Sequence, residues 1–200
     1  MGVSDRIETR AAINVLEARK HADRIGKPLT DFVTVNLYHS AVEADEASKT
    51  WRAFLTNRYV RSLRRHGKTY PKAMPPSYVW TIENAHDDRL HVHWSVHVPD
   101  TFRSTFEKRL EGWLRKEVGM IYDSSAFLNR KKVYNAPGLV NYLLKGMGEK
   151  AARTYDIEPT ACGQVVGKRV GHAKALGPTA IAAYWAAQRE RERASLVALR

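Results

Sequence analysis

Apolar residues recur with the 3.6-residue period of an α-helix in four parts of the chain. In each part they lie three or four positions apart, so that they share one face of a helix. The predicted helices cover residues 4–24, 42–65 and 101–118 and a segment that opens at Pro137, which suits a first helical turn. A last helix is expected from about residue 179, and Ser4 is expected to cap the first one.

Four further runs predict strands, at residues 31–39, 78–83, 89–98 and 126–134. The second and third runs are joined by the turn-prone stretch NAHDD, which predicts an antiparallel hairpin. This order of helices and strands predicts an α+β fold, in which helices flank a central antiparallel sheet, rather than a doubly wound parallel sheet. We divide the chain into an N-terminal helical extension (1–30), a core (31–150), and a basic loop with a C-terminal helix (151–200).

The composition adds a large excess of positive charge. Lys and Arg number 33 against 21 Asp and Glu, a net charge of +12, which favours a polyanionic partner such as nucleic acid. No apolar run approaches the roughly 18 residues of a membrane-spanning helix, and the N-terminus lacks the apolar stretch of a signal peptide. The single cysteine, Cys162, suits a reducing compartment. We therefore expect a cytoplasmic protein without a membrane partner.

Two basic segments supply the candidate nucleic-acid contacts. They are Arg58, Arg61, Arg64 and Arg65 in RYVRSLRRHGK, and Lys168, Arg169 and Lys174 in GQVVGKRVGHAKALGP. Such side chains can follow a phosphate backbone, and binding through them weakens as salt rises. The alternative for the second segment is a solvated linker. Tyr59, within the first segment, fits the apolar stripe of its helix better than a base-stacking surface.

The stretch LHVHWSVHVP, residues 90–99, carries three histidines in seven positions. Residues two apart share one face of a strand, so His91 and His93 can ligate the same ion. Glu83, at the end of the preceding strand, can supply a third ligand. This mixed set with open positions suits Mg²⁺ or Mn²⁺ bound to a phosphate, whereas one cysteine argues against a closed zinc site. His97 lies too far along the strand, and the alternative for the whole stretch is a solvated face without metal.

On the helix that opens at Pro137, Tyr142 and Lys145 are three residues apart and share a face. A phenol, with a pKa near 10, is a weak nucleophile until a cation stabilises its phenolate. Taken alone, the pair is also typical of a partly buried tyrosine beside a surface lysine.

In chain order, FVTVNL (32–37), Glu83 with HVH (91–93), and YLLK (142–145) resemble the three successive motifs of the HUH endonucleases. The resemblance is to the rolling-circle replication initiator (Rep) type with a single catalytic tyrosine, and it covers residues 32–145. Relaxases are less similar, because their tyrosine precedes the histidine motif. The HUH transposases share the order but typically carry glutamine in place of Lys145. The proline that often follows the first motif is absent here.

The resemblance implies a sheet of about five antiparallel strands and an enzyme that nicks and joins single-stranded DNA at specific sequences. Such an enzyme would start rolling-circle replication of a plasmid, phage or other mobile element at an origin hairpin. Tyr142 would form a 5′-phosphotyrosine, and Lys145 would position the site or neutralise the phenolate. Glu83, His91 and His93 would hold Mg²⁺ or Mn²⁺. Partners would include a host polymerase and a host helicase, since the chain has no Walker A sequence.

Three other readings stay open, and the sequence argues against a fourth, the cyclic phosphodiesterase. One is a basic DNA-binding regulator that keeps the fold without cutting, and another is an HUH transposase. A cyclic phosphodiesterase of the two-histidine kind needs two His-x-Ser/Thr motifs, and only HWS at 93–95 is of that form. A metal-binding structural protein would take up metal without affinity for DNA.

Overall fold

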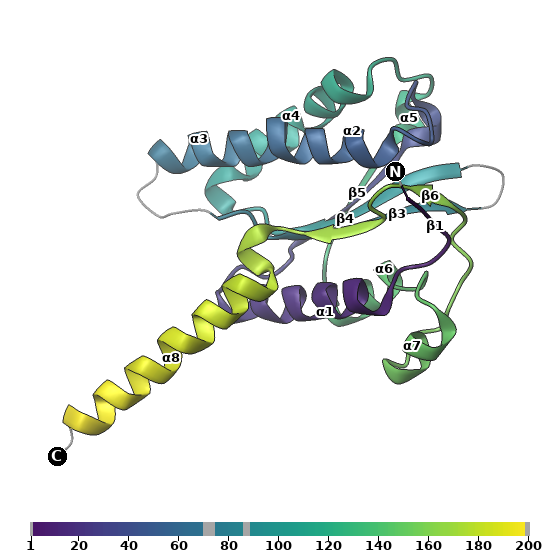
Figure 1. The fold of residues 1–200 in the computed structure, drawn as a ribbon. Coiled ribbons are helices and arrows are strands. Elements are labelled where there is room, and N and C mark those ends of the chain that lie inside the picture. Colours follow the sequence, from purple (N-terminus) through teal and green to yellow (C-terminus); the bar gives the residue numbers. More distant parts are fainter. Residues whose placement is uncertain (1, 70–74, 86–88, 199–200) are drawn as a thin grey trace.

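A computed structural model describes residues 2–69, 75–85 and 89–198 of the chain (Figure 1). The helices are α1 (Thr9–Arg24), α2 (Ala47–Phe54), α3 (Arg61–Thr69), α4 (Asp100–Val118), α5 (Ser124–Phe127), α6 (Ala136–Leu143), α7 (Glu149–Thr154) and α8 (Pro178–Ala198). The strands are β1 (Val3–Ser4), β2 (Asp31–Asn36), β3 (Tyr78–Ala85), β4 (Arg89–Val96), β5 (Leu128–Lys132), β6 (Val165–Val166) and β7 (Val170–His172). A π-helical segment, Leu55–Val60, joins α2 to α3 into one continuous rod.

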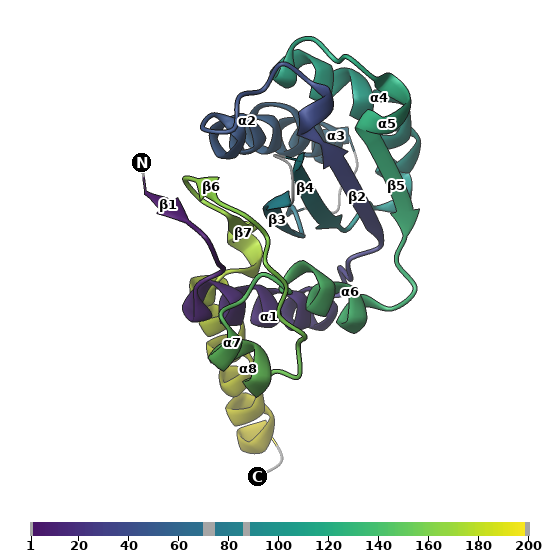
Figure 2. The same ribbon diagram turned by 90° about the vertical axis from the view of Figure 1, so that its right-hand side faces the viewer.

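Five strands form one antiparallel sheet in the order β5-β2-β4-β3-β7, with β4 at its centre (Figure 2). The α+β class and the β3–β4 hairpin are thereby confirmed, although residues 86–88 of the turn lie outside the described residues. The fifth strand, β7, comes from the basic segment that was expected to be a loop. That expectation is wrong, because the segment pairs through β6 with β1 and through β7 with β3.

One face of the sheet packs against the rod of α2 and α3 and against α4, which lie above the sheet in Figure 1. The predicted stripe on the rod is confirmed, since all four of its residues are buried: Trp51, Leu55, Tyr59 and Leu63. Trp94 of β4 is the centre of this layer, with ring centroids 4.9 Å from Tyr59 and 5.6 Å from Trp51. The alternation of β4 sends Val92, Trp94 and Val96 into the same layer.

The opposite face of the sheet is covered by α1 and α6, with α7 beside them (Figure 1). Helix α1 offers small side chains, among them Ala12, Ala18 and Ala22, all fully buried. Val140 and Leu143 of α6 pack in the same cluster. Small residues let α1 approach the sheet closely, and the polar face of β4 is therefore enclosed.

The N-terminal segment begins differently from the prediction. Ser4 lies in β1, opposite Val165 of β6, and α1 begins only at Thr9. The residue before the helix, Glu8, makes no side-chain capping bond. Tertiary pairing of β1 with β6 therefore overrides the local capping preference of Ser4.

Strand β7 is hard to read from sequence because it is short and contains a glycine. Gly171 pairs with Trp80 of β3, and a Cβ atom at Gly171 would lie 2.8 Å from the Trp80 ring. Only glycine lets the β7 backbone lie this close to the indole. What identifies β7 as a strand is the close packing of Gly171 against Trp80 on the neighbouring strand, and this contact cannot be recognised from the local sequence.

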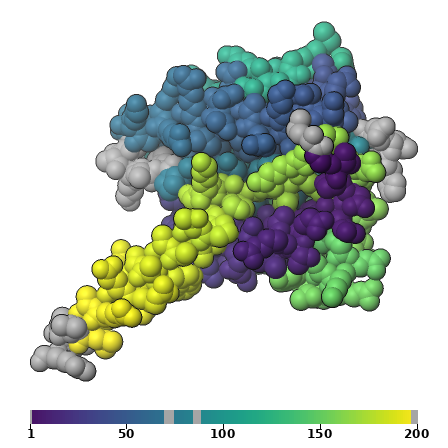
Figure 3. Space-filling view, in the orientation of Figure 1, coloured from purple at the N-terminus to yellow at the C-terminus, as the bar shows by residue number. Residues whose placement is uncertain are grey.

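Helix α8 projects away from the body of the molecule, as its yellow residues show in Figure 3. Its first turns contact α1 and the 3₁₀ turn Lys174–Leu176. Arg24 of α1 lies over the ring of Trp185, 5.3 Å from its centroid. Among the described residues, no helix is both long and apolar enough to cross a lipid bilayer.

A buried ion pair joins the sheet to the upper helix layer. Asp31, at the start of β2, is fully buried, and Arg103 of α4 donates to both of its carboxylate oxygens at 3.1–3.2 Å. Lys132 of β5 lies 3.5 Å from Asp31 Oδ1. The pair fixes α4 against the end of the sheet.

Replacing Arg103 with leucine should lower the free energy of unfolding by about 3 kcal/mol or more, because it leaves a buried carboxylate with a weaker partner. Urea unfolding followed by circular dichroism measures the change. The matched control is Arg130→Leu, which removes a pair with Glu107 that is partly exposed to solvent. That control should cost less than about 1 kcal/mol, and equal losses would show that Asp31 does not need Arg103.

Candidate metal centre

The register of the hairpin brings the three predicted ligands together. Glu83 of β3 lies directly opposite His91 of β4, and His93 follows two residues along the same face. One potential ligand atom from each of the three side chains lies within 4.8 Å of the others. The predicted His-His-carboxylate cluster is therefore present.

Glu83 is the centre of the cluster. Its Oε2 atom is 3.2 Å from His91 Nε2, 3.6 Å from His93 Nε2 and 3.0 Å from Lys145 Nζ. Its other oxygen, Oε1, is buried and has no hydrogen-bond partner among the described residues. A buried carboxylate oxygen without a partner is costly and is satisfied when a cation binds.

The histidine face of β4 is enclosed rather than solvated. His93 is 4% exposed and Glu83 is 3% exposed, because the layer of α1 and α6 covers this side of the sheet. His91 is less buried and lies toward the rim. The alternative, a solvated histidine face, is thus excluded for His93.

Hydrogen bonds orient both imidazole rings with Nε2 toward Glu83. His91 Nδ1 lies 2.8 Å from the carbonyl oxygen of Arg89, which only accepts, so Nδ1 carries the proton. His93 Nδ1 lies 3.1 Å from Thr34 Oγ1 of β2. A neutral ring protonated on Nδ1 presents its Nε2 lone pair to a metal, whereas a ring with a proton on Nε2 donates to Glu83 instead. Two rings of the first kind and the Glu83 carboxylate form a donor set that can hold a cation at its centre.

The electrostatics keep the ligands in the states that metal binding needs. Burial lowers the pKa of His93 despite the nearby Glu83 carboxylate, which favours the neutral ring. Burial alone would raise the pKa of Glu83, but hydrogen bonds from His91, His93 and Lys145 outweigh it and hold that pKa below its usual range. Two imidazoles and one carboxylate, with room for oxygen ligands, fit Mg²⁺ or Mn²⁺.

Helix α6 brings Tyr142 and Lys145 to the cluster. Asn135 caps the helix by accepting from the Gly138 N–H, and Pro137 lies in the first turn as predicted. Tyr142 Oη is 3.4 Å from His93 Nε2. The helix ends at Leu143, so Lys145 lies just beyond it, yet its Nζ still lies 4.2 Å from the centroid of the Tyr142 ring.

An open groove of about 500 Å³ leads to this tyrosine. Its floor is made by alternate residues of β2 and β5, among them Thr34, Asn36 and Asn129, and Leu139 of α6 borders it. Tyr142 is 43% exposed and lines the same groove. The hydroxyl is therefore reachable from solvent, and His93, although only 4% exposed, lines the same groove.

His97 and Arg169, two further residues considered in the sequence analysis, lie outside the cluster. His97 lies beyond the end of β4, and its Nδ1 is 2.8 Å from the Pro28 carbonyl oxygen, which confirms it as a hydrogen-bonded histidine outside the cluster. Arg169 is 4% exposed and donates to the carbonyl oxygens of Ser4, Asp5 and Gly163. The prediction that Arg169 contacts DNA is wrong, because its guanidinium holds the N-terminal segment.

The remaining basic candidates are accessible to different degrees. Arg58 is half-buried and pairs with Glu117 of α4. The exposed ones are Arg61, Arg64, Arg65, Lys168 and Lys174.

Sequence reasoning missed the contribution of β2 to the site. Besides Thr34, Phe32 stacks on His93 with ring centroids 5.4 Å apart and meets Tyr142 edge-on at 6.2 Å. The signal was present, because Phe32, Thr34 and Asn36 alternate with the buried Val33 and Val35. The pairing of β2 with β4 places these β2 side chains beside the histidines, and the sequence of β2 alone does not reveal that pairing.

In comparisons with protein-family models, with curated proteins and with solved structures, this chain finds no match. The interpretation of the site therefore rests on its own geometry.

The wild-type protein should bind one Mn²⁺ ion in isothermal titration calorimetry. His91→Gln removes one ligand, and we expect it to weaken binding more than the roughly 10- to 100-fold typical of losing an outer-shell partner. His97→Gln is the control and should bind Mn²⁺ as the wild type does. Equal binding by all three proteins would exclude the cluster as the metal site.

Thr34→Val should weaken Mn²⁺ binding by about 10- to 100-fold, because it removes the partner of His93 Nδ1 while keeping the shape of the side chain. Thr34→Ser retains the hydroxyl and should restore affinity. Calorimetry checks both, with Thr179→Val, an exposed substitution in α8, as the control. If valine and serine behave alike, the hydroxyl does not orient His93.

Proposed function

We propose that this protein is a metal-dependent enzyme that nicks and rejoins single-stranded DNA through Tyr142, as an HUH endonuclease of the replication-initiator type does. The observation that supports it most is the position of the Tyr142 hydroxyl. It lies 3.4 Å from a candidate metal ligand, beside the Lys145 ammonium, at the accessible end of a groove. A tyrosine with only a structural role does not require a metal ligand, an ammonium group and an open groove around its side chain.

Lys145 is suited to stabilise a phenolate. Burial alone would lower the pKa of Lys145, but its ion pair with Glu83 raises it, so the ammonium stays charged. A cation over the ring and next to the oxygen lowers the free energy of the negative phenolate that attacks phosphorus. Lys145 therefore connects the nucleophile and the ligand cluster.

The proposed reaction is a transfer of one phosphodiester bond. Tyr142 Oη attacks the scissile phosphorus and loses its proton to solvent in the open groove. The bond from phosphorus to the 3′ oxygen breaks, and that oxygen leaves and takes up a proton as a free 3′-OH. The phosphate remains on the 5′ strand as a phosphotyrosine, and attack by a 3′-OH reverses the step and rejoins the strand.

Glu83, His91 and His93 would hold the metal. A bound divalent ion supplies Lewis-acid polarisation of the phosphoryl oxygens and stabilises the charge that develops on them. Thr34 and the Arg89 carbonyl hold both rings with Nε2 toward Glu83, where the ion would bind. The proposed cleavage needs one hydroxyl as nucleophile, so a single tyrosine is enough. Tyr134 is not a second nucleophile in this proposal, because it is 94% exposed and lies before α6.

The groove favours a single strand as the substrate. It combines aromatic rings, Phe32 and Tyr142, with the amides of Asn36 and Asn129 and with Lys131. Rings that stack on bases, together with a cation for the backbone, are the usual equipment of single-strand binders. A paired duplex hides its bases from such a surface. Initiation of rolling-circle replication of a plasmid, phage or other mobile element is the biological role that fits this chemistry.

Incubation with labelled single-stranded DNA pools, with Mn²⁺ or with EDTA, tests the proposal on denaturing gels. Wild-type protein should form a covalent DNA adduct only with Mn²⁺, and Tyr142→Phe should form none because it lacks the nucleophile. Tyr134→Phe is the matched control and should form the adduct. DNA binding without any adduct, in pools that include the native replicon, would favour a non-cutting regulator.

A further inference from the structure

We infer that α3 carries a second DNA-binding surface, which holds the duplex next to the single-stranded segment in the nicking groove. The α3 patch consists of Arg61, Arg64, Arg65 and Lys68. This inference takes its partner, DNA, from the proposed function, but it does not depend on strand cleavage.

The four cations form one stripe. Their positions, i, i+3, i+4 and i+7, place them on the same side of the helix, opposite the buried Leu63. The stripe is roughly 10 Å long at 1.5 Å per residue. Helix α3 contains no acidic residue, and none of the four cations has a carboxylate within 4.0 Å in the part of the chain that the structure describes. Four unpaired positive charges this close together repel one another and favour a polyanion.

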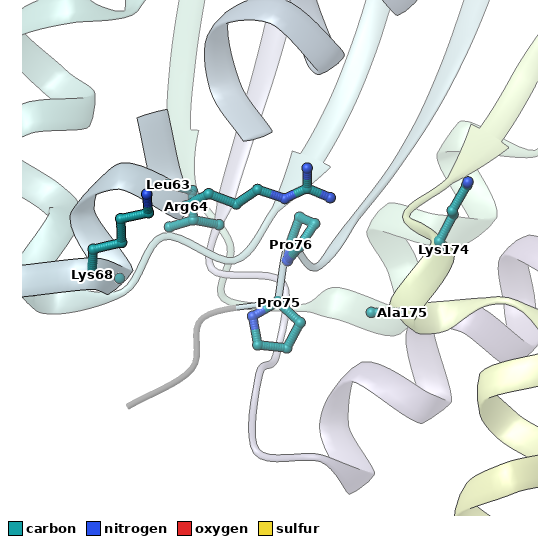
Figure 4. A pocket seen from close by; sticks show the side chains of 8 residues that line it. Leu63, Arg64, Lys68, Pro75, Pro76, Lys174 and Ala175 are labelled. Atoms are coloured by element: carbon teal, nitrogen blue, oxygen red, sulfur yellow. The ribbon is translucent and has the colours of Figure 1, made fainter. Parts of the chain in front are cut away.

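The surface around the stripe is hollowed on both sides. One pocket, of about 480 Å³, is lined by Thr56, Asn57 and the four patch residues. A second, of about 550 Å³, lies between the end of α3 and the 3₁₀ turn that follows β7. Figure 4 shows Lys68 and Lys174 on opposite sides of Pro75 and Pro76, with Arg64 reaching over Pro76. Lys174 thus adds a fifth cation across the pocket.

The chemistry of this surface differs from that of the groove. The described residues that line the two pockets include no aromatic side chain, and the nearby Tyr59 is fully buried. Without rings to stack on unpaired bases, the patch is suited to the phosphates of the backbone. Duplex DNA presents phosphates while its bases stay paired, so duplex is the form that fits.

The location of the patch separates it from the nicking site. Helix α3 belongs to the layer above the sheet, whereas the Glu83 cluster faces the layer below (Figure 1). The patch also lies near the start of β3, and Glu83 lies near its end. From Tyr78 to Glu83 the strand spans roughly 16 Å at about 3.3 Å per residue. That length corresponds to roughly five base pairs of B-DNA at 3.4 Å each, so along the direction of β3 the patch and the Glu83 cluster are separated by about that many base pairs.

The test uses the full chain and two probes, a duplex of about 20 base pairs, or two helical turns, and an oligothymidylate of the same length. The patch variant is Arg61→Gln/Arg64→Gln/Arg65→Gln/Lys68→Gln. Fluorescence anisotropy over a salt series gives the affinity and its salt dependence. For the duplex, the slope of log K against log salt should become shallower by about 3 to 4, since each phosphate contact contributes about 0.9. Affinity at about 0.1 M salt should fall roughly 100- to 1000-fold.

The control removes the same charge elsewhere, from exposed cations of α4 and α7: Lys108→Gln/Arg109→Gln/Lys116→Gln/Lys150→Gln. It should keep at least most of the duplex affinity, and the patch variant should keep wild-type affinity for oligothymidylate. Equal losses in the two variants, or an equal loss on both probes, would overturn the assignment. Circular dichroism confirms that each variant is folded.

The two proposals fail in different ways. If Tyr142-dependent adducts form but the patch variant binds duplex like the wild type, the α3 patch is not a duplex site and nicking stands. If no adduct forms with any DNA but the patch variant alone loses duplex binding, nicking fails and the patch stands.

Discussion

The pairing register of β4 with its two neighbours places Glu83 opposite His91 and Thr34 opposite His93. Because side chains alternate along a strand, a slip of one residue would send both histidines into the upper hydrophobic layer. Trp94 prevents that slip, since it fills the centre of the aromatic cluster beneath the rod of α2 and α3. The hydrophobic core on one face therefore fixes the ligand geometry on the other.

Enclosing the polar face has a cost that the site itself offsets. A carboxylate such as Glu83, 3% exposed, is unfavourable in a protein interior unless cations lie beside it. Lys145 supplies one at 3.0 Å, and the convergent imidazole nitrogens define a place for another. The same burial that makes the cluster costly would strengthen its electrostatic interactions with the charge of a phosphate bound in the proposed reaction. Positive charge beside Glu83 therefore both stabilises the buried carboxylate and supports the proposed chemistry.

Local patterns predicted the parts of the fold that local forces decide. The stripe of the α2–α3 rod, the hairpin, and the proximity of Tyr142 and Lys145 follow from periods of 3.6 and 2 and from a spacing of three. Strand β7 and the ribbon of β1 with β6 depend on pairing between distant segments, so Ser4 and Gly171 gave misleading signals. Arg169 looked like a phosphate contact because a basic tripeptide does not reveal whether its guanidinium is buried. The α3 arginines were predicted from a dense basic run in the sequence, but their separation from the site could be seen only in the layers of the fold.

The strand β2 shows why a short hydrophobic motif can matter to a site that contains none of its residues as ligands. Its inward face, Val33 and Val35, belongs to the upper core, and this anchors the backbone. Its other face supports the site, with Thr34 against one imidazole nitrogen and Phe32 against the rings of His93 and Tyr142. One strand therefore positions a candidate metal ligand and the proposed nucleophile, which lie 49 residues apart in the chain. A rigid strand held on its far face defines the distance between these two side chains better than a loop does, because its backbone has no alternative register.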